Sequence, residues 1–113
     1  MAETLGTFEQ AVLLAILRLK EDAYGRGILR EVQERLKREI AAGAVHATLE
    51  RLEEKGLVRS RLGQGKPVRD GRAKRFYRLE PEGVQALNDA RAAVNDIWRG
   101  IPFPLKGFAW HLK

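Results

Sequence analysis

The sequence contains no cysteine, which excludes a disulfide framework, thiolate chemistry and a cysteine-ligated zinc site. Only two histidines, His46 and His111, are present, so we expect no histidine-based metal site and no cofactor. The longest apolar run, residues 11–17, is far shorter than a membrane span. The first ten residues lack the basic and then apolar pattern of a signal peptide. We therefore expect a cytoplasmic protein that binds neither a metal nor a membrane.

Recognisable catalytic patterns are also absent from the 113 residues, a length that predicts one domain or one domain with a tail. The sequence shows neither a nucleophile with a neighbouring base nor a metal-binding cluster. The run Gly63-Gln64-Gly65-Lys66 superficially resembles a phosphate-binding loop, but it lacks the full motif and the strand-to-helix context. We therefore do not expect an enzyme.

Positive charge is concentrated between Arg59 and Arg78. This tract of twenty residues holds eight Lys or Arg and a single acid, Asp70. Its net charge of +7 exceeds the formal +6 of the whole chain, so the remaining residues sum to −1. Such a local basic patch indicates a polyanionic partner, and double-stranded DNA is the partner that we expect.

The basic tract also has the frame of a β-hairpin. A short apolar run at 56–58 leads in, glycines and Pro67 fill the middle, and an alternating run at 76–79 leads out. This pattern predicts a wing that lies along a phosphate backbone, and the alternative is a solvated basic loop without a partner. As a wing, its DNA-contacting residues would be Arg59, Arg61, Lys66, Arg69, Arg72, Lys74 and Arg75.

Two helices are predicted at the start of the chain. The first begins at a capping box formed by Thr7 and Gln10 and runs to about Lys20. The second covers roughly residues 24–38. The predicted third helix, about residues 42–55, has apolar residues spaced i, i+4, i+7 and is followed by Gly56 in the position favoured after a helix end.

The third helix is the candidate DNA-reading element. Its buried stripe is predicted to consist of Val45, Leu49 and Leu52, and the N-terminal half of the opposite face is small and uncharged. A surface of this kind can approach a duplex closely. The candidate DNA-contacting residues of this helix are Ala44, His46, Ala47, Thr48 and Arg51.

Each candidate on this helix has a plainer alternative. Arg51 either reads a base or pairs with Glu50 or Glu54. Thr48 either contacts a thymine methyl or a phosphate, or bonds its own helix backbone. His46 is interpreted as a backbone contact or a surface residue rather than a catalytic base, because no partner carboxylate or nucleophile is expected near it.

A fourth helix is predicted to begin at Pro81, where the missing N–H costs nothing. Its apolar residues recur at alternating spacings of three and four, which is typical of packing against another helix. We divide the chain into a winged helix-turn-helix domain (1–80), a C-terminal dimerisation helix (81–101) and an apolar tail (102–113). The predicted fold class is mainly α with a small β-hairpin, in the order of a winged helix-turn-helix.

Three segments carry a family resemblance: Tyr24-Gly25 with Ile28, the run from Gly43 to Val58, and the hairpin exit from Arg75 to Gly83. In this order and at these spacings, from Leu13 to Leu87, they resemble the PadR family of bacterial transcriptional regulators. Two positions depart from the family pattern. His46 stands where the family usually has Tyr near the DNA backbone, and Glu80 stands where Thr is common.

The resemblance implies a homodimer of the short-tailed branch, in which the C-terminal helix packs against the first helix of the partner. The expected interface residues are Leu13, Leu17, Leu87, Ala90, Val94, Ile97, Trp98 and Ile101. In some short-tailed relatives, tryptophans on this helix line a pore that binds flat, drug-like molecules. By resemblance Trp98 is therefore either a ligand-stacking residue or an interface anchor.

The leading hypothesis is a dimeric repressor that reads a pseudo-palindromic operator with two third helices ~34 Å apart. A small apolar or aromatic effector at the dimer interface would change the spacing of the two heads. The alternative is a winged-helix adaptor that binds another protein and has only non-specific affinity for nucleic acid. Sequence dependence of binding at physiological salt distinguishes the two, because purely electrostatic binding weakens equally on all duplexes.

Overall fold

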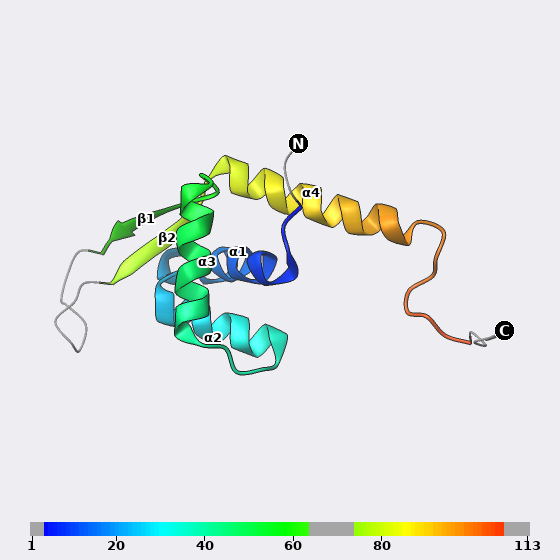
Figure 1. Ribbon diagram of the computed structural model, residues 1–113, viewed down its shortest axis with the longest axis horizontal. Coiled ribbons are helices and arrows are strands. Elements are labelled where there is room, and N and C mark those ends of the chain that lie inside the picture. Colours follow the sequence, from blue (N-terminus) through cyan, green and yellow to red (C-terminus); the bar gives the residue numbers. More distant parts are fainter. Residues whose placement is uncertain (1–3, 64–73, 108–113) are drawn as a thin grey trace.

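The computed structural model describes residues 4–63 and 74–107. The elements in chain order are α1 (Thr7–Leu19), the 3-10 turn η1 (Lys20–Asp22), α2 (Gly25–Leu36), α3 (Ala42–Glu54), β1 (Val58–Leu62), β2 (Arg75–Leu79) and α4 (Pro81–Trp98). Figure 1 shows α1, α2 and α3 gathered into one group, with the hairpin extending from one side and α4 leading away on the other. The predicted fold class is confirmed.

The first turn of α1 is capped differently from the prediction. Gly6 is the N-cap residue, and its amide donates to Glu9 Oε1 at 3.1 Å. Thr7 lies inside the helix, and Gln10 Nε2 instead donates to the Leu5 carbonyl at 2.9 Å. The predicted capping box of Thr7 and Gln10 is therefore wrong by one residue, because the carboxylate of Glu9 is the better acceptor at the positive end of the helix.

The core lies where the three helices meet the base of the hairpin. Its largest fully buried side chains are Val12, Leu13, Ile28, Val32, Val45, Thr48, Leu49 and Leu52. Burying one such aliphatic side chain contributes roughly 1.5–3 kcal/mol. The predicted stripe of α3 is thus confirmed, and α1 supplies Val12 and Leu13 from a face covered by α2 and α3.

Two residues predicted for the dimer interface are buried within this single chain. Leu13 and Ala90 are both 0% exposed, so neither can meet a partner subunit. The prediction is wrong for these two residues because the wide apolar surface of α1 faces the core of its own chain and α4 packs against α1. On α1 the exposed apolar residues are Leu14 and Leu17.

The hairpin is an antiparallel pair whose register runs from Val58 opposite Leu79 to Leu62 opposite Arg75. Val58 and Tyr77 are buried, which places every second residue of each strand on the side of the core. The Tyr77 amide also donates to the Ala23 carbonyl at 2.8 Å, so residues 23–24 form a short edge beside β2. Burial raises the pKa of the Tyr77 hydroxyl, and the nearby charge of Arg75, which lowers it, is the smaller effect. The hydroxyl therefore stays neutral.

A close backbone contact fixes where α4 leaves the hairpin. The Glu80 amide donates to the Leu57 carbonyl at 2.9 Å, and Pro81 occupies the first position of α4. Gly83 is buried against the same carbonyl, so that a Cβ atom at this position would collide with the Leu57 oxygen. The direction of α4 therefore depends on the absence of a side chain at residue 83.

Beyond its first two turns, α4 presents an apolar surface to solvent. Leu87 is half-buried, but Val94 and Ile97 are 43% and 77% exposed, and Ile101 just past the helix is 50% exposed. The Trp98 ring meets Phe103 edge-to-face at a centroid distance of 5.6 Å. Among the described residues, no helix combines the length and apolar character needed to cross a membrane.

We predict that Gly83→Ala destabilises the fold by about 1–3 kcal/mol, because the added methyl forces α4 away from the Leu57 carbonyl. Gly43→Ala is the matched control, since a Cβ at residue 43 of α3 meets no atom within 4 Å. The control should be neutral or stabilising by about 0.5–1 kcal/mol. Urea unfolding followed by circular dichroism measures both variants, and equal effects of the two substitutions would contradict the close contact.

An ion pair joins the start of α1 to the end of α3. Lys55 Nζ donates to Glu9 Oε2 at 3.3 Å, on the carboxylate that also accepts from the Gly6 amide. Burial raises the pKa of the Glu9 carboxyl, but the Gly6 amide and the Lys55 ammonium outweigh burial and lower it below its ordinary value. The folded protein therefore favours the charged form of Glu9.

We predict that Glu9→Gln lowers the free energy of unfolding at pH 7 by up to about 1 kcal/mol. A depressed pKa contributes stability above the pKa of the unfolded carboxyl, and this contribution is lost as the pH falls through the folded pKa. The deficit of the variant should therefore shrink below pH 4 in urea unfolding series. Glu34→Gln, at an exposed position of α2, serves as the control. A deficit of equal size at pH 3 and pH 7 would contradict this account.

Candidate nucleic-acid interface

The exposed face of α3 is formed by small residues and bordered by charge. Gly43, Ala44 and Ala47 are exposed, as are His46 and Arg51. The backbone of the first two turns is therefore accessible without long side chains in front of it. A surface of this shape fits the major groove of a duplex.

Thr48 does not belong to this exposed face. It is 2% exposed, and its Oγ1 accepts a hydrogen bond from Arg51 Nη2 at 3.0 Å. The prediction that Thr48 contacts DNA is therefore wrong. The physical reason is helical spacing, because Thr48 lies three residues after Val45 and four before Leu52 and so joins the buried stripe.

The same hydrogen bond changes the interpretation of Arg51. The predicted alternative was an ion pair with Glu50 or Glu54, but the contact of Arg51 in the structure is the Thr48 hydroxyl. This bond fixes one edge of the guanidinium and leaves the residue exposed. Arg51 is thus held by a buried hydroxyl and keeps further donors on an exposed side chain.

His46 has a carboxylate neighbour that the sequence analysis missed. Its Nε2 lies 3.0 Å from Glu50 Oε1, one helical turn along α3, and both side chains are exposed. The expectation of no nearby carboxylate was wrong because residues i and i+4 of a helix lie on one face. A negative charge consequently sits beside His46 on the surface of α3.

Two hollows flank α3, and each has a cation from α2 or the turn that follows it. One hollow of about 360 Å³ is lined by Arg26, His46 and apolar residues. The other, of about 420 Å³, is lined by Phe8, Arg38 and Arg51 among others. The sequence analysis missed Arg26 and Arg38, because the charges of the second helix are nearly balanced. Their positions at its two ends were the feature that could have identified them.

The hairpin is held against α3 by a polar network. Ser60 donates to Glu53 of α3 through its amide at 3.2 Å and through its hydroxyl at 2.8 Å. Arg75 Nη1 in turn donates to Ser60 Oγ at 3.0 Å. Arg75 is therefore the described hairpin cation that lies on the same side as α3.

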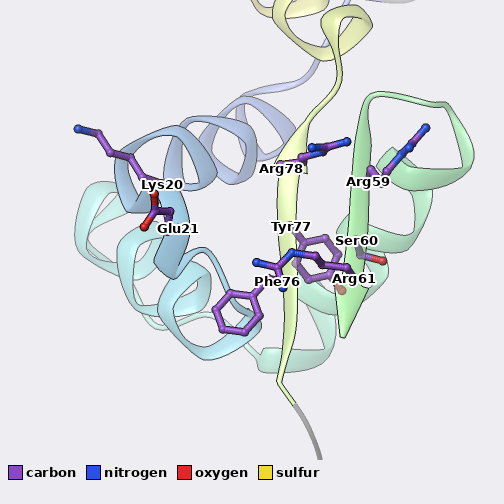
Figure 2. Close-up of a pocket in the computed structure, with 8 residues that line it drawn as sticks. All are labelled: Lys20, Glu21, Arg59, Ser60, Arg61, Phe76, Tyr77 and Arg78. Atoms are coloured by element: carbon purple, nitrogen blue, oxygen red, sulfur yellow. The ribbon is translucent and has the colours of Figure 1, made fainter. Parts of the chain in front are cut away.

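The other described hairpin cations lie on the opposite face of the sheet. Alternation along the strands places Arg59, Arg61 and Arg78 there together with Phe76, as Figure 2 shows. Lys74 precedes β2, and its ammonium lies 4.2 Å from the centre of the Tyr24 ring. The sequence analysis treated all these cations as one surface, whereas the structure divides them between two.

Three more predicted DNA contacts lie outside the described residues: Lys66, Arg69 and Arg72.

Glu80, one of the two departures from the family pattern, pairs with two arginines of the hairpin. Glu80 Oε1 lies 3.2 Å from Arg59 Nε and 3.8 Å from Arg78 Nε. Its carboxylate thus joins the two strands at the start of α4.

Comparisons with known proteins identify the family. The sequence profile of the transcriptional regulator PadR-like family matches residues 13–89. The transcriptional regulator Rv3488 of Mycobacterium tuberculosis is 39% identical over 62 residues, which are 55% of this chain and 54% of that protein. The chain thus aligns with about half the length of this curated relative.

Solved structures show the same fold. A PadR family transcription regulator from Clostridium difficile superposes with a TM-score of 0.64 at 23% identity, covering 83% of this chain and 93% of that one. RosR of Halobacterium salinarum gives 0.64 at 26% identity, covering 90% and 84% of the two chains. A PadR family regulator from Eggerthella lenta gives 0.61 at 26% identity, covering 80% and 76%. From the matched profile and the shared winged fold, this chain belongs to the PadR-like family of transcriptional regulators.

Proposed function

We propose that this regulator is a dimeric repressor that reads a pseudo-palindromic operator with α3 and its hairpin. The observation that carries the proposal is the face of α3, where small residues are exposed between Arg26 on one flank and Arg38 on the other. In this arrangement α3 enters the major groove, and flanking cations contact phosphates on both sides of it.

Sequence reading is assigned to Arg51 within this arrangement. Arginine is suited to guanine, because its guanidinium donates to O6 and N7 together. The bond from Arg51 to the Thr48 hydroxyl limits the freedom of the side chain before DNA arrives, which lowers the entropic cost of binding. Ala44, Ala47 and His46 provide close approach and a backbone contact. Arg75 and the tip of the hairpin are assigned to phosphates.

The exposed apolar surface supports the dimer. Val94, Ile97 and Ile101 continue the helix-packing pattern of α4 into solvent, and Leu14 and Leu17 are exposed on α1. Surfaces of this kind mark association sites. A two-fold dimer through α4 and α1 would set two α3 helices ~34 Å apart, one turn of DNA. Repression would then be steric, by occupation of a promoter.

Trp98 is assigned to the interface as an anchor. Its ring is half-buried and already meets Phe103 of the same chain edge-to-face. Aromatic side chains in such positions contribute strongly to interfaces. A small apolar or aromatic effector that binds at this interface would act by favouring one spacing of the two heads over the other.

The test of function is a competition experiment. A labelled fragment from upstream of the protein's own coding sequence, and then a library of genomic fragments, is bound at 0.15 M salt with excess random duplex present. Binding that survives the competitor is the expected result. Loss of binding on every fragment, with equal salt dependence on all duplexes, would instead favour the adaptor function. For a dimer that neutralises roughly six phosphates, we expect a log–log salt slope of about −5.

We predict that Arg51→Ala lowers the affinity for the selected operator by about 1–3 kcal/mol per reading contact and leaves affinity for random duplex nearly unchanged. The difference arises because base contacts, unlike phosphate contacts, depend on sequence. Arg30→Ala, at an exposed position of α2, is the control and should change neither affinity. An equal loss on operator and random DNA would assign Arg51 to the phosphates.

We predict that Ile97→Glu shifts the protein from dimer to monomer, raising the dissociation constant by at least about tenfold, because a carboxylate would be buried in an apolar interface. Sedimentation velocity over a concentration series measures the shift. Asn95→Glu is the matched control, as it adds the same charge at an exposed position of the same helix. Equal sedimentation of both variants and the wild type would exclude this surface from the interface.

A further inference from the structure

A groove lies on the face of the hairpin that is turned away from α3. We name it the outer groove, and its lining residues are Lys20, Glu21, Arg59, Ser60, Arg61, Phe76, Tyr77 and Arg78. Its volume is about 350 Å³, which is within the range of small-molecule sites. Figure 2 shows Arg61 beside the Phe76 ring, Arg59 and Arg78 farther along the two strands, and Lys20 and Glu21 on the opposite side.

Positive charge dominates this groove. Four of its lining residues are cations and one is an acid, Glu21. Arg59 and Arg78 share the carboxylate of Glu80, and their side chains remain 65% and 72% exposed. Two arginines on one carboxylate leave an excess of positive charge, with several N–H donors available to an incoming anion.

Arg61 is held in place by an aromatic ring. Its guanidinium carbon lies 5.3 Å from the centre of the Phe76 ring, and Phe76 packs on Tyr24 at a centroid distance of 5.9 Å. A cation held over a ring keeps its charge while losing part of its freedom. The ring therefore limits the movement of the guanidinium, which would lower the entropic cost of binding an oxyanion.

The outer groove is separate from the surface of α3. Ser60 also lines the groove, but its hydroxyl bonds on the other face of the strands, where it donates to Glu53 and accepts from Arg75. Since neighbouring residues of a strand point to opposite faces, the cations of the groove cannot share the phosphates that α3 contacts. An anion held in the groove would therefore be a different one from the phosphates at α3.

We infer that the outer groove is a second phosphate-binding site, built to hold a phosphoryl group through Arg59, Arg61 and Arg78. The phosphoryl group belongs either to a DNA strand that passes the outer face of the hairpin or to a free phosphate compound. The binding itself does not depend on the proposed repressor function, because it requires neither an operator nor a dimer.

The first test uses inorganic pyrophosphate as the probe, titrated into the full-length protein at constant ionic strength and followed by backbone amide NMR. Expected are saturable shifts centred on residues 59–61 and 76–78. Arg61→Gln should weaken binding about tenfold through the loss of a charge-assisted hydrogen bond. Glu80→Gln should strengthen binding, because it releases Arg59 and Arg78 from their carboxylate.

Arg30→Gln removes an equal charge from an exposed position of α2 and is the matched control. Its affinity for pyrophosphate should equal that of the wild type. Shifts confined to α3, or equal weakening by Arg61→Gln and Arg30→Gln, would overturn the site. Amide spectra of the free variants verify that each one is folded.

A second arm identifies the source of the phosphate. If DNA supplies it, Arg61→Gln reduces the log–log salt slope for duplex binding by about 1, and pyrophosphate competes with duplex. If a free compound supplies it, the variant binds duplex like the wild type and loses only pyrophosphate. Failure of sequence-specific DNA binding would leave the pyrophosphate result unaffected, so the two proposals are tested separately.

Discussion

The burial of Tyr77 is the constraint on which the arrangement of charge depends. Its ring lies in the core, and its amide donates to the Ala23 carbonyl. Together these contacts fix the position of β2 along the core and decide which face of the strand is turned inward. Once one residue of a strand points inward, the alternation of side chains decides which face each remaining residue of that strand occupies. Arg75 is thereby directed toward α3, and Phe76 and Arg78 toward the outer groove. Ser60, opposite Tyr77 in the register, reaches Glu53 and binds the hairpin to α3.

The second consequence of this packing is that the described cations of one basic tract lie on two faces of the hairpin. The charge of the tract is a property of composition, and it accounts for attraction to a polyanion at long range. Contact is decided at short range, where Glu80 pairs with Arg59 and Arg78 on one face and Glu53 holds Ser60, the acceptor of Arg75, on the other. The carboxylate of Glu80 therefore ties Arg59 and Arg78 together at the start of α4.

The two ends of the molecule differ in how completely the chain covers its own apolar residues. Around α1, α2 and α3 the core is closed, and even Thr48 is drawn into it. Along α4 the apolar pattern continues past Ala90 without cover, and Ile97 is 77% exposed. A helix of this kind stabilises little by itself, because its apolar surface stays in water. Its direction, set by Gly83 against the Leu57 carbonyl, makes it available to another subunit.

The sequence by itself determined the order of elements, the stripe Val45, Leu49 and Leu52, and the concentration of charge between Arg59 and Arg78, since periodicity and composition are local properties. Helix ends were less certain, as the cap at Gly6 shows. Only the tertiary structure decided that Leu13 and Thr48 are buried, that Arg26 and Arg38 border α3, and that the hairpin cations divide between two faces. These outcomes depend on which neighbour covers a residue and on strand register, and both arise from contacts between segments distant in the chain.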